Sequence, residues 1–154
     1  MSPHSPYAIL YDSVATEPLS GSEVGALALH AAQANRRLHL TGALLYSAPD
    51  GDAPAVFMQW LEGPRAAVGE LYGRIERDPR HTRLAVHAAG PLRTLTGRDD
   101  RLFPAWGMAF ETVEARPASF DAFVAYWSTR EAPDTFEKIR AFYRRGQRRG
   151  RSQR

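Results

Sequence analysis

Short stretches of apolar residues, bordered by turn-forming residues, recur along the chain and predict five β-strands. In the first strand Tyr7, Ile9 and Tyr11 point one way. Ala8 and Leu10 point the other way, so both faces of this strand are expected to be buried. The predicted strands cover residues 7–11, 41–46, 55–61, 82–90 and 106–112.

Apolar residues spaced three and four positions apart predict helices between and after the strands. The apolar stripe of the first helix begins with Val24, Leu27 and Ala31. Asn35 then interrupts the stripe one turn before Leu38. The predicted helices cover residues 21–38, 64–77, 118–130 and 134–145, and residues 12–19 are expected to connect the first strand to the first helix.

The order of these elements predicts an α+β fold, a ferredoxin-like βαββαββ sheet with a fifth strand. The first two helices are expected to pack on one face of this sheet. Because the strands are apolar on both faces, the second face also needs a cover. The two C-terminal helices are the expected cover. The turn-rich segment SAPDGDAP joins the strands at 41–46 and 55–61 into a hairpin.

The chain has 154 residues, enough for one domain with a sizeable core. It contains no Cys, which excludes thiolate metal sites, iron–sulfur clusters and thiol nucleophiles. Its five His do not pair at the spacing of a helical metal site, so no metal is expected. The sequence contains neither a membrane-length apolar stretch nor a signal peptide at its N-terminus. We therefore expect a cytoplasmic protein that does not contact a membrane.

Positive charge is concentrated near the C-terminus. Residues 131–154 carry eight Lys or Arg and three acidic residues. Residues 1–130 carry twelve basic and fourteen acidic residues. Seven Arg fall within residues 140–154, and residues 147–154 are expected to form a basic, disordered tail. Aromatic residues do not alternate with these arginines, so nucleic acid is not an expected partner. A tail that binds nucleic acid stays open as an alternative to a solubilising end.

Three polar side chains occupy positions where apolar ones are expected: Tyr11, Asn35 and Gln59. Gln59 lies between Phe57 and Leu61 on one face of its strand, and the first and third strands are neighbours in a ferredoxin-like sheet. Each of the three alone fits a buried polar group that is satisfied within the core. Together they suit a flat heterocycle with alternating donors and acceptors. None is a strong acid, base or nucleophile at neutral pH, so hydrolytic catalysis is not expected.

Five segments, in their order and spacing, resemble the BLUF domain, a blue-light sensor that binds flavin. The segments are Tyr11-Asp12-Ser13, Asn35 with LTGALLY at 40–46, FMQWLEG at 57–63, RIERDPRH at 74–81 and WGM at 106–108. The resemblance implies a flavin-binding domain over residues 5–113 and a helical cap over residues 117–146. It also implies no enzymatic output domain, as in short stand-alone members of the family, so the chain is not expected to be an enzyme.

The resemblance further implies a role for each matching residue. FAD would bind non-covalently between the first two helices, with FMN or riboflavin as substitutes. Asn35 would bond the pyrimidine edge of the flavin, and Gln59 would bridge the flavin and Tyr11. Tyr11 would give an electron and a proton to the excited flavin, after which a rearranged Gln59 hydrogen bond would shift the absorption to longer wavelength. The other flavin-bordering positions would be Leu27, Arg74, Ile75, Asp78, Arg80 and His81, and the outward relay would use Trp106 and Met108.

Plain structural roles stay open for several of these residues. Arg74 and Asp78 are four positions apart and fit an ordinary ion pair on a helix. His81 follows the predicted end of a helix and could be a solvent-exposed residue of a turn. Trp106 and Met108 fit the core of the fold.

Three features depart from the BLUF pattern. Ala34 stands where many members have Asn or His in contact with the flavin. Asp12 stands where Arg is frequent, and it is expected to face solvent with little consequence. The hairpin over residues 47–56 is longer than usual and lies next to Gln59 in the sequence.

Two functions of different classes follow from these observations. The first is a blue-light photoreceptor that signals through protein–protein contacts to an unknown downstream regulatory protein and forms homo-oligomers. The alternative is a light-silent or flavin-free interaction module of the same fold. Yellow colour in the purified protein, and a shift of that colour under blue light, would separate the two.

Overall fold

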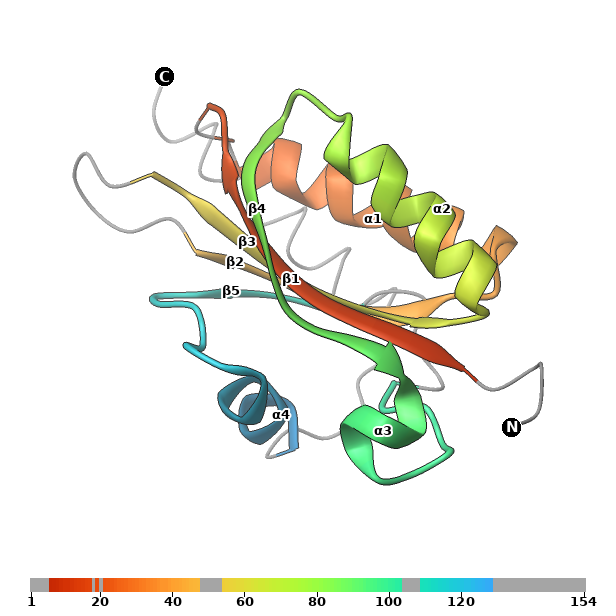
Figure 1. Ribbon diagram of the computed structural model, residues 1–154. Helices are drawn as coiled ribbons and strands as arrows, with labels where there is room; N and C mark the ends of the chain where they lie inside the picture. The colour runs from red at the N-terminus through yellow and green to blue at the C-terminus, as the bar shows by residue number, and fades with distance from the viewer. Residues whose placement is uncertain (1–5, 18, 20, 48–53, 104–108, 129–154) are drawn as a thin grey trace, which may run out of the picture.

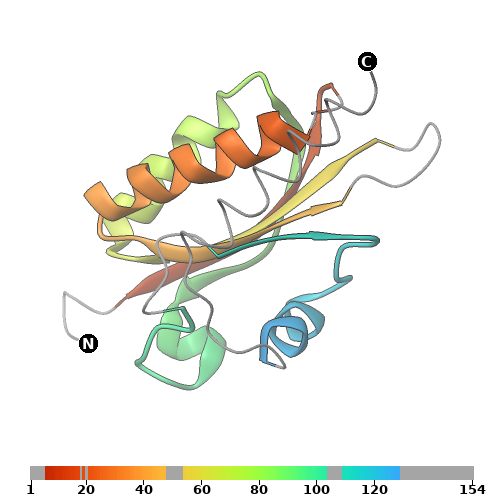
Figure 2. The ribbon, with the colours of Figure 1, turned by 180° about the vertical axis from the view of Figure 1, so that it is seen from behind.

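The computed structural model describes residues 6–17, 19, 21–47, 54–103 and 109–128 (Figure 1). The elements are β1 (Tyr7–Ala15), α1 (Gly21–Arg37), β2 (Thr41–Ser47), β3 (Val56–Gly63), α2 (Arg65–Glu76), β4 (His81–Pro91), α3 (Leu92–Thr96), β5 (Ala109–Val113) and α4 (Phe120–Ser128). The strands form a single sheet in the order β4-β1-β3-β2-β5. Helices α1 and α2 lie on one face, and α3 and α4 lie on the other (Figures 1 and 2). The predicted α+β, ferredoxin-like fold is confirmed.

The central strands pair in the way that the sequence predicts. β1 and β3 are antiparallel neighbours, and their register places Tyr11 directly opposite Gln59. β2 and β3 form the predicted antiparallel hairpin, in which Leu44 lies opposite Gln59. β5 pairs with β2 in parallel, which adds the fifth strand at the edge. Two candidate residues therefore meet at the centre of the sheet.

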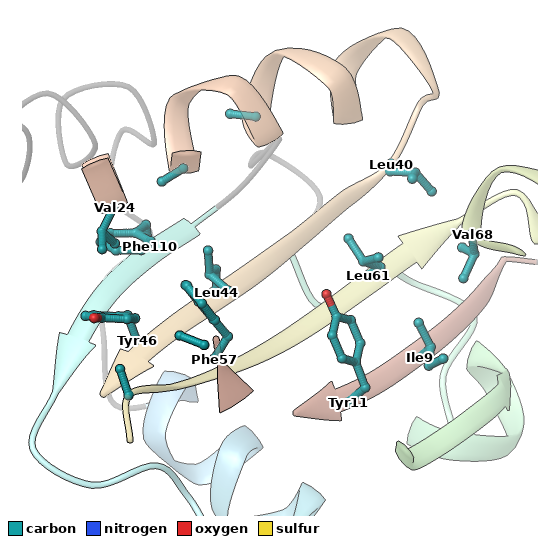
Figure 3. Close-up of a cluster of buried hydrophobic side chains, with 14 residues drawn as sticks. Ile9, Tyr11, Val24, Leu40, Leu44, Tyr46, Phe57, Leu61, Val68 and Phe110 are labelled. Carbon is teal, nitrogen blue, oxygen red and sulfur yellow. The ribbon is translucent and has the colours of Figure 1, made fainter. Parts of the chain in front are cut away.

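Two apolar clusters, one on each face of the sheet, hold the helices in place. The first lies under α1 and α2 and contains Ile9, Tyr11, Phe57 and Leu61 among its buried members (Figure 3). The second lies against α3 and α4 and is built around Trp60. This division confirms the alternation predicted for the first and third strands. It also explains why both faces need helices, since neither could be left in water.

Strand β1 is longer than predicted. It continues through Asp12 and Ser13 to Ala15, so the interpretation of residues 12–15 as a connection is wrong. Asp12 and Ser13 are polar residues typical of turns, yet both are buried and hydrogen-bonded to histidines of β4. These side-chain bonds satisfy the polar groups and let the strand continue through the core.

The first helix buries a slightly different stripe from the predicted one. The fully buried positions are Val24, Ala28, Ala32 and Asn35. Leu27 is only partly buried and lies beside this stripe. The small alanines let α1 approach the sheet closely, which leaves the Leu27 side of the helix facing the space between α1 and α2.

The C-terminal prediction is confirmed only as far as the structure describes the chain. α4 buries Phe123 and Trp127 against the second face of the sheet, as predicted. The five-residue helix α3 was not predicted and adds to the same cover. The predicted helix over residues 134–145, the tail at 147–154, the hairpin turn at 48–53 and the relay residues Trp106 and Met108 lie outside the described residues.

Among the residues that the structure describes, no helix has the length and apolar character needed to cross a bilayer.

Candidate functional site

A cavity of about 270 Å³ opens between α1, α2 and the sheet. Its wall is built from residues of both helices, of β1, β2 and β3, and of the segment that leads into β4. Every residue that the resemblance placed at the flavin, together with Tyr11, lies in this wall. The lining residues are Tyr11, Leu27, His30, Ala31, Ala34, Asn35, Leu44, Phe57, Gln59, Leu71, Arg74, Ile75, Asp78, Arg80 and His81.

A hydrogen-bonded pair of polar residues lies at the base of the cavity. The Tyr11 hydroxyl donates a hydrogen bond to Oε1 of Gln59, and both residues are buried. Burial, followed by the nearby Tyr72 and Asp78, raises the pKa of the Tyr11 phenol far above its ordinary value. The hydroxyl is therefore protonated at any physiological pH. The ring of Tyr72 meets the Tyr11 ring edge-on, with 5.3 Å between centroids, and fixes its orientation.

Asn35 reaches the cavity from the last turn of α1. Its backbone carbonyl accepts a 2.8 Å bond from the Leu40 amide, which closes the turn between α1 and β2. The side chain is fully buried. Its Oδ1 atom accepts no hydrogen bond among the described residues, although Asn35 has interactions through other atoms. The backbone bond explains the placement of Asn35, and the cavity wall gains an amide with both donor and acceptor capacity.

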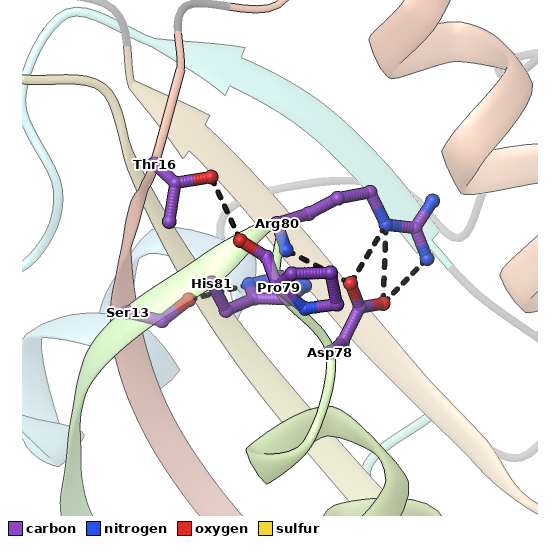
Figure 4. A network of polar contacts seen from close by, with 6 residues as sticks. All are labelled: Ser13, Thr16, Asp78, Pro79, Arg80 and His81. Atoms are coloured by element: carbon purple, nitrogen blue, oxygen red, sulfur yellow. Dashed lines mark hydrogen bonds and ion pairs between the residues drawn. The ribbon is translucent and has the colours of Figure 1, made fainter.

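A charged turn borders the cavity after α2 (Figure 4). Arg80 binds the Asp78 carboxylate with its backbone amide at 2.9 Å and with Nη2 at 2.5 Å. The bond from the Arg80 side chain lowers the pKa of Asp78 to about 2, so this carboxylate stays ionised. The turn thus presents a fixed ion pair at the edge of the cavity.

Arg74 is not the partner of Asp78. Its guanidinium binds the Glu70 carboxylate at 2.6 Å on the exposed surface of α2. The interpretation of Arg74 and Asp78 as an ion pair on a helix is therefore wrong. α2 ends at Glu76, and Arg77 forms its C-cap. Asp78 therefore lies beyond the helix, where the (i, i+4) geometry no longer applies. Arg74 nevertheless lines the cavity.

His81 is partly buried, so the interpretation as a solvated turn residue is wrong. Its Nδ1 shares a 2.9 Å hydrogen bond with the Ser13 hydroxyl, and its ring packs against Phe57 at 5.1 Å. Figure 4 shows the Ser13–His81 contact beside the Asp78–Arg80 pair. Burial lowers the pKa of His81 below its ordinary 6.5, despite the opposing charge of Asp78. The imidazole is therefore neutral at pH 7.

This pKa shift predicts a pH-dependent stability. Below about pH 6.5 the unfolded chain binds a proton at His81 that the folded chain resists. The free energy of unfolding therefore decreases as the pH is lowered from about 6.5 to the pKa of His81 in the folded chain. Urea midpoints measured between pH 5 and 8 should therefore rise with pH. His81→Asn should make this rise shallower. Equal slopes in His81→Asn and the unaltered chain would contradict this assignment.

The sequence interpretation missed several residues of the cavity wall. His30 and Ala31 follow Leu27 at helical spacing, and that spacing is the signal that would have included them, whereas Ala34 was already expected at a position that contacts the flavin. Leu44 lies opposite Gln59 on β2, a placement that needs the strand register. Leu71 lies one helical turn before Ile75 on α2 and also reaches the cavity.

The chemistry of the wall suits a planar polar ring system. Leu27 and Ile75 provide apolar contacts from two different helices, while Asn35 and Gln59 provide amide groups. The volume is near the lower end of the ~300–1,000 Å³ found for ligand pockets. Such a cavity fits one ring system of a larger ligand, with the rest at the charged rim.

Comparison with known proteins finds similar sequences and folds. The family model for BLUF, sensors of blue-light using FAD, matches residues 7–109. The photoactivated adenylate cyclase subunit beta of Euglena longa is 35% identical over 107 residues, which are 69% of this chain and 11% of that protein. The subunit alpha of Euglena gracilis is 33% identical over 84 residues, or 54% of this chain and 8% of that protein. The chain thus spans about a tenth of the length of the curated relatives that it matches.

Solved structures share the fold. The dark-state structure of BlrB, a BLUF protein, superimposes with a TM-score of 0.61 and 24% identity, and covers 90% of this chain and 96% of that one. A bacterial light-regulated adenylyl cyclase gives a TM-score of 0.61 and 25% identity, over 80% of this chain and 33% of that one. The residues that the family model matches, 7–109, include the whole cavity wall.

Proposed function

The chain belongs to the BLUF family, sensors of blue light that use FAD, and from that premise we propose that its light response begins at the Tyr11–Gln59 pair. The observation that carries the proposal is the buried hydrogen bond from the Tyr11 hydroxyl to Gln59, in the wall of a cavity between two helices. The chain would thus be a blue-light photoreceptor and not an enzyme.

The residues of the cavity fit the flavin part of FAD. The amides of Asn35 and Gln59 match the polar edge of such a ring system, and Leu27 and Ile75 would pack on its faces. Arg80 carries positive charge at the rim, where the phosphate-bearing part of a dinucleotide needs it. FMN or riboflavin would fill the same ring site with fewer contacts at the rim.

The pair of Tyr11 and Gln59 can move a proton. FAD held by these residues would supply the absorption of blue light and the acceptor for an electron from Tyr11. Because burial keeps the Tyr11 hydroxyl protonated, loss of an electron from the ring would leave an acidic phenol. Its proton would move along the existing bond to Oε1 of Gln59, while Nε2 of Gln59 gives up one of its own protons into the cavity. The Gln59 amide then changes its hydrogen-bond pattern by rotation, tautomerisation or both. A stronger bond from that amide into the cavity shifts the absorption to longer wavelength.

The output of the proposed sensor is a protein contact. The curated relatives are named as adenylate cyclases, but this chain matches only about a tenth of their length, so their activity is not assigned to it. A change at the sheet would reach another protein through the helices on the second face. The partner would be a downstream regulator or a second copy of the chain.

The cavity and its amides favour the photoreceptor over a flavin-free module of the same fold.

Asn35→Ala tests the cofactor site. One buried neutral hydrogen bond contributes roughly 0.5–1.5 kcal/mol, so the dissociation constant for FAD should rise about two- to tenfold. The measurement is FAD titration monitored by fluorescence, with urea unfolding of the flavin-free chain in parallel. Gln33→Ala, at an exposed position of the same helix, should leave both values unchanged. Equal losses of affinity and stability in Asn35→Ala would make Asn35 structural and would count against the proposed site.

A further inference from the structure

Asp12 is a buried carboxylate on the strand that carries Tyr11. It is 7% exposed, which contradicts the expectation that it faces solvent. Its side chain lies on the face of β1 opposite to that of Tyr11, because successive residues of a strand alternate. A buried carboxylate is costly unless charged or hydrogen-bonding groups compensate it. Its partners therefore indicate what it holds together.

Two basic side chains from different parts of the chain meet on one oxygen of Asp12. His87 on β4 approaches Oδ2 through Nε2 at 2.7 Å, and Nη1 of Arg116 approaches the same oxygen at 3.2 Å. Because a carboxylate only accepts, Nε2 of His87 carries the proton. Arg116 belongs to the segment between β5 and α4 and also donates to the Pro117 carbonyl at 3.1 Å. Asp12 therefore ties β1 to the entry of α4.

The backbone pairing around Asp12 is irregular. Between Leu10 and Tyr11 the partners on β4 pass from Ala88 to Val86, which leaves His87 as an extra residue. A second shift falls between Asp12 and Val14. Bulges of this kind redirect side chains and interrupt the ladder of backbone bonds. The contacts of Asp12 reinforce β1 at the point where its pairing with β4 is weakest.

Helix α4 is linked to the same region by a second contact. Phe120, its first residue, stacks on Trp60 at 5.3 Å between ring centroids. Trp60 follows Gln59 along β3 and points to the second face of the sheet. The first residue of α4 thus touches Trp60, which follows Gln59, and Arg116 in the segment before α4 touches Asp12, which follows Tyr11. Of these two contacts, the ion pair is the one that is lost when a single charge is removed.

We propose that Asp12 is a positioning residue that transmits a change at Tyr11 and Gln59 to the segment 114–117 and α4 through its ion pair with Arg116. This rests on the proposed photoreceptor function. Asp12 shares a peptide bond with Tyr11, so a small displacement of β1 at Tyr11 changes the distance from the Asp12 carboxylate to Arg116. The attraction is steep with distance in a partly desolvated site. A modest change at the cavity can therefore shift the balance between a docked and a loosened α4.

Hydrogen–deuterium exchange of α4 tests the proposal in the full chain, with FAD bound, in the dark and under blue light. In the dark, Asp12→Asn and Arg116→Gln should each speed exchange in residues 120–128 by roughly three- to tenfold. The double variant should not exceed the larger single effect, because either single change already removes the ion pair between Asp12 and Arg116. Arg116→Lys should restore part of the protection. Asp99→Asn, which removes an exposed pair with Arg93, should change nothing.

The response to light separates this proposal from the proposed function. Both variants should keep the light-induced absorption shift, while the light–dark difference in exchange at α4 falls at least threefold. Unchanged dark exchange in both variants, or an undiminished light–dark difference, would overturn the role of Asp12. Loss of the absorption shift in Asp12→Asn alone would overturn it too, because Asp12 would then act in the photochemistry. No shift in the unaltered chain would instead refute the photoreceptor function, and the dark exchange would still decide whether Asp12 braces α4.

Discussion

Tyr11→Phe is expected to abolish the blue-light absorption shift while the chain still folds and binds FAD. The substitution removes only the hydroxyl, and the ring keeps its edge-on contact with Tyr72. The buried phenol is the proton donor to Gln59 in the proposed mechanism, so no proton can move to the amide without it. The loss should exceed 90% of the shift, a drop of about tenfold or more and far beyond a positioning effect. The measurement is the absorption of the flavin-loaded variant before and after blue light.

The matched control for this variant is Tyr72→Phe. Tyr72 touches the Tyr11 ring, is partly exposed, and is absent from the cavity wall. Its loss of a hydroxyl should leave the absorption shift in place and should alter only its rate of recovery. A normal shift in Tyr11→Phe would contradict the role of Tyr11. An equal loss in both variants would show that the effect is not specific to the hydrogen bond between Tyr11 and Gln59.

Gly42→Ala is expected to destabilise the fold more than any surface substitution. Gly42 lies on β2 opposite Leu61, and an added methyl group would overlap the backbone carbonyl oxygen of Trp60. Backbone atoms in the centre of a sheet cannot yield as a flexible side chain can. Overpacking typically costs ~1–3 kcal/mol, and we expect about 3 kcal/mol or more here, out of a total of ~5–15 kcal/mol. Because the overlap pushes on β3 beside Gln59, flavin binding should weaken as well.

Gly69→Ala provides the opposite result within the same chain. Gly69 is exposed in the interior of α2, and an added methyl group would meet nothing within 4 Å. Alanine is favoured over glycine in a helix interior by ~0.5–1 kcal/mol, so this variant should be more stable. Urea unfolding of both variants gives the comparison. A Gly42→Ala chain as stable as Gly69→Ala would show that the two strands can separate at no cost.

Much of the fold could be predicted because local apolar patterns determine it. The alternation along 7–11 and 55–61 assigned Tyr11 and Gln59 to one face, and the ferredoxin-like topology made their strands neighbours. The same patterns predicted that both faces of the sheet need helices. Helix α3 escaped prediction because five residues are too short to show a helical period.

The polar contacts were harder to predict because they depend on partners far along the chain. Asp12 was expected in solvent, and its two partners come 75 and 104 positions later, which only the folded sheet brings together. Arg74 has an acidic residue four positions away on each side, Glu70 and Asp78. The sequence pattern could not choose between them, and the end of α2 decides for Glu70.

The candidate site was assembled largely from the family resemblance. The nine residues that it placed at the flavin or at its donor all line one cavity, but their individual roles stay predictions until variants are measured. Trp106 and Met108 stay predictions as well, since they lie outside the described residues. The structure adds the ion pair between Asp12 and Arg116, which the sequence pattern did not indicate, as a link from β1 to the segment before α4.

The most direct test of the central claim is an absorption spectrum of the purified chain with FAD bound, recorded in the dark, after blue light, and again after recovery. Binding at the cavity and a proton moving between Tyr11 and Gln59 predict a flavin band that shifts reversibly to longer wavelength. A folded chain that retains no flavin would contradict the account, and so would one whose flavin spectrum is the same before and after illumination.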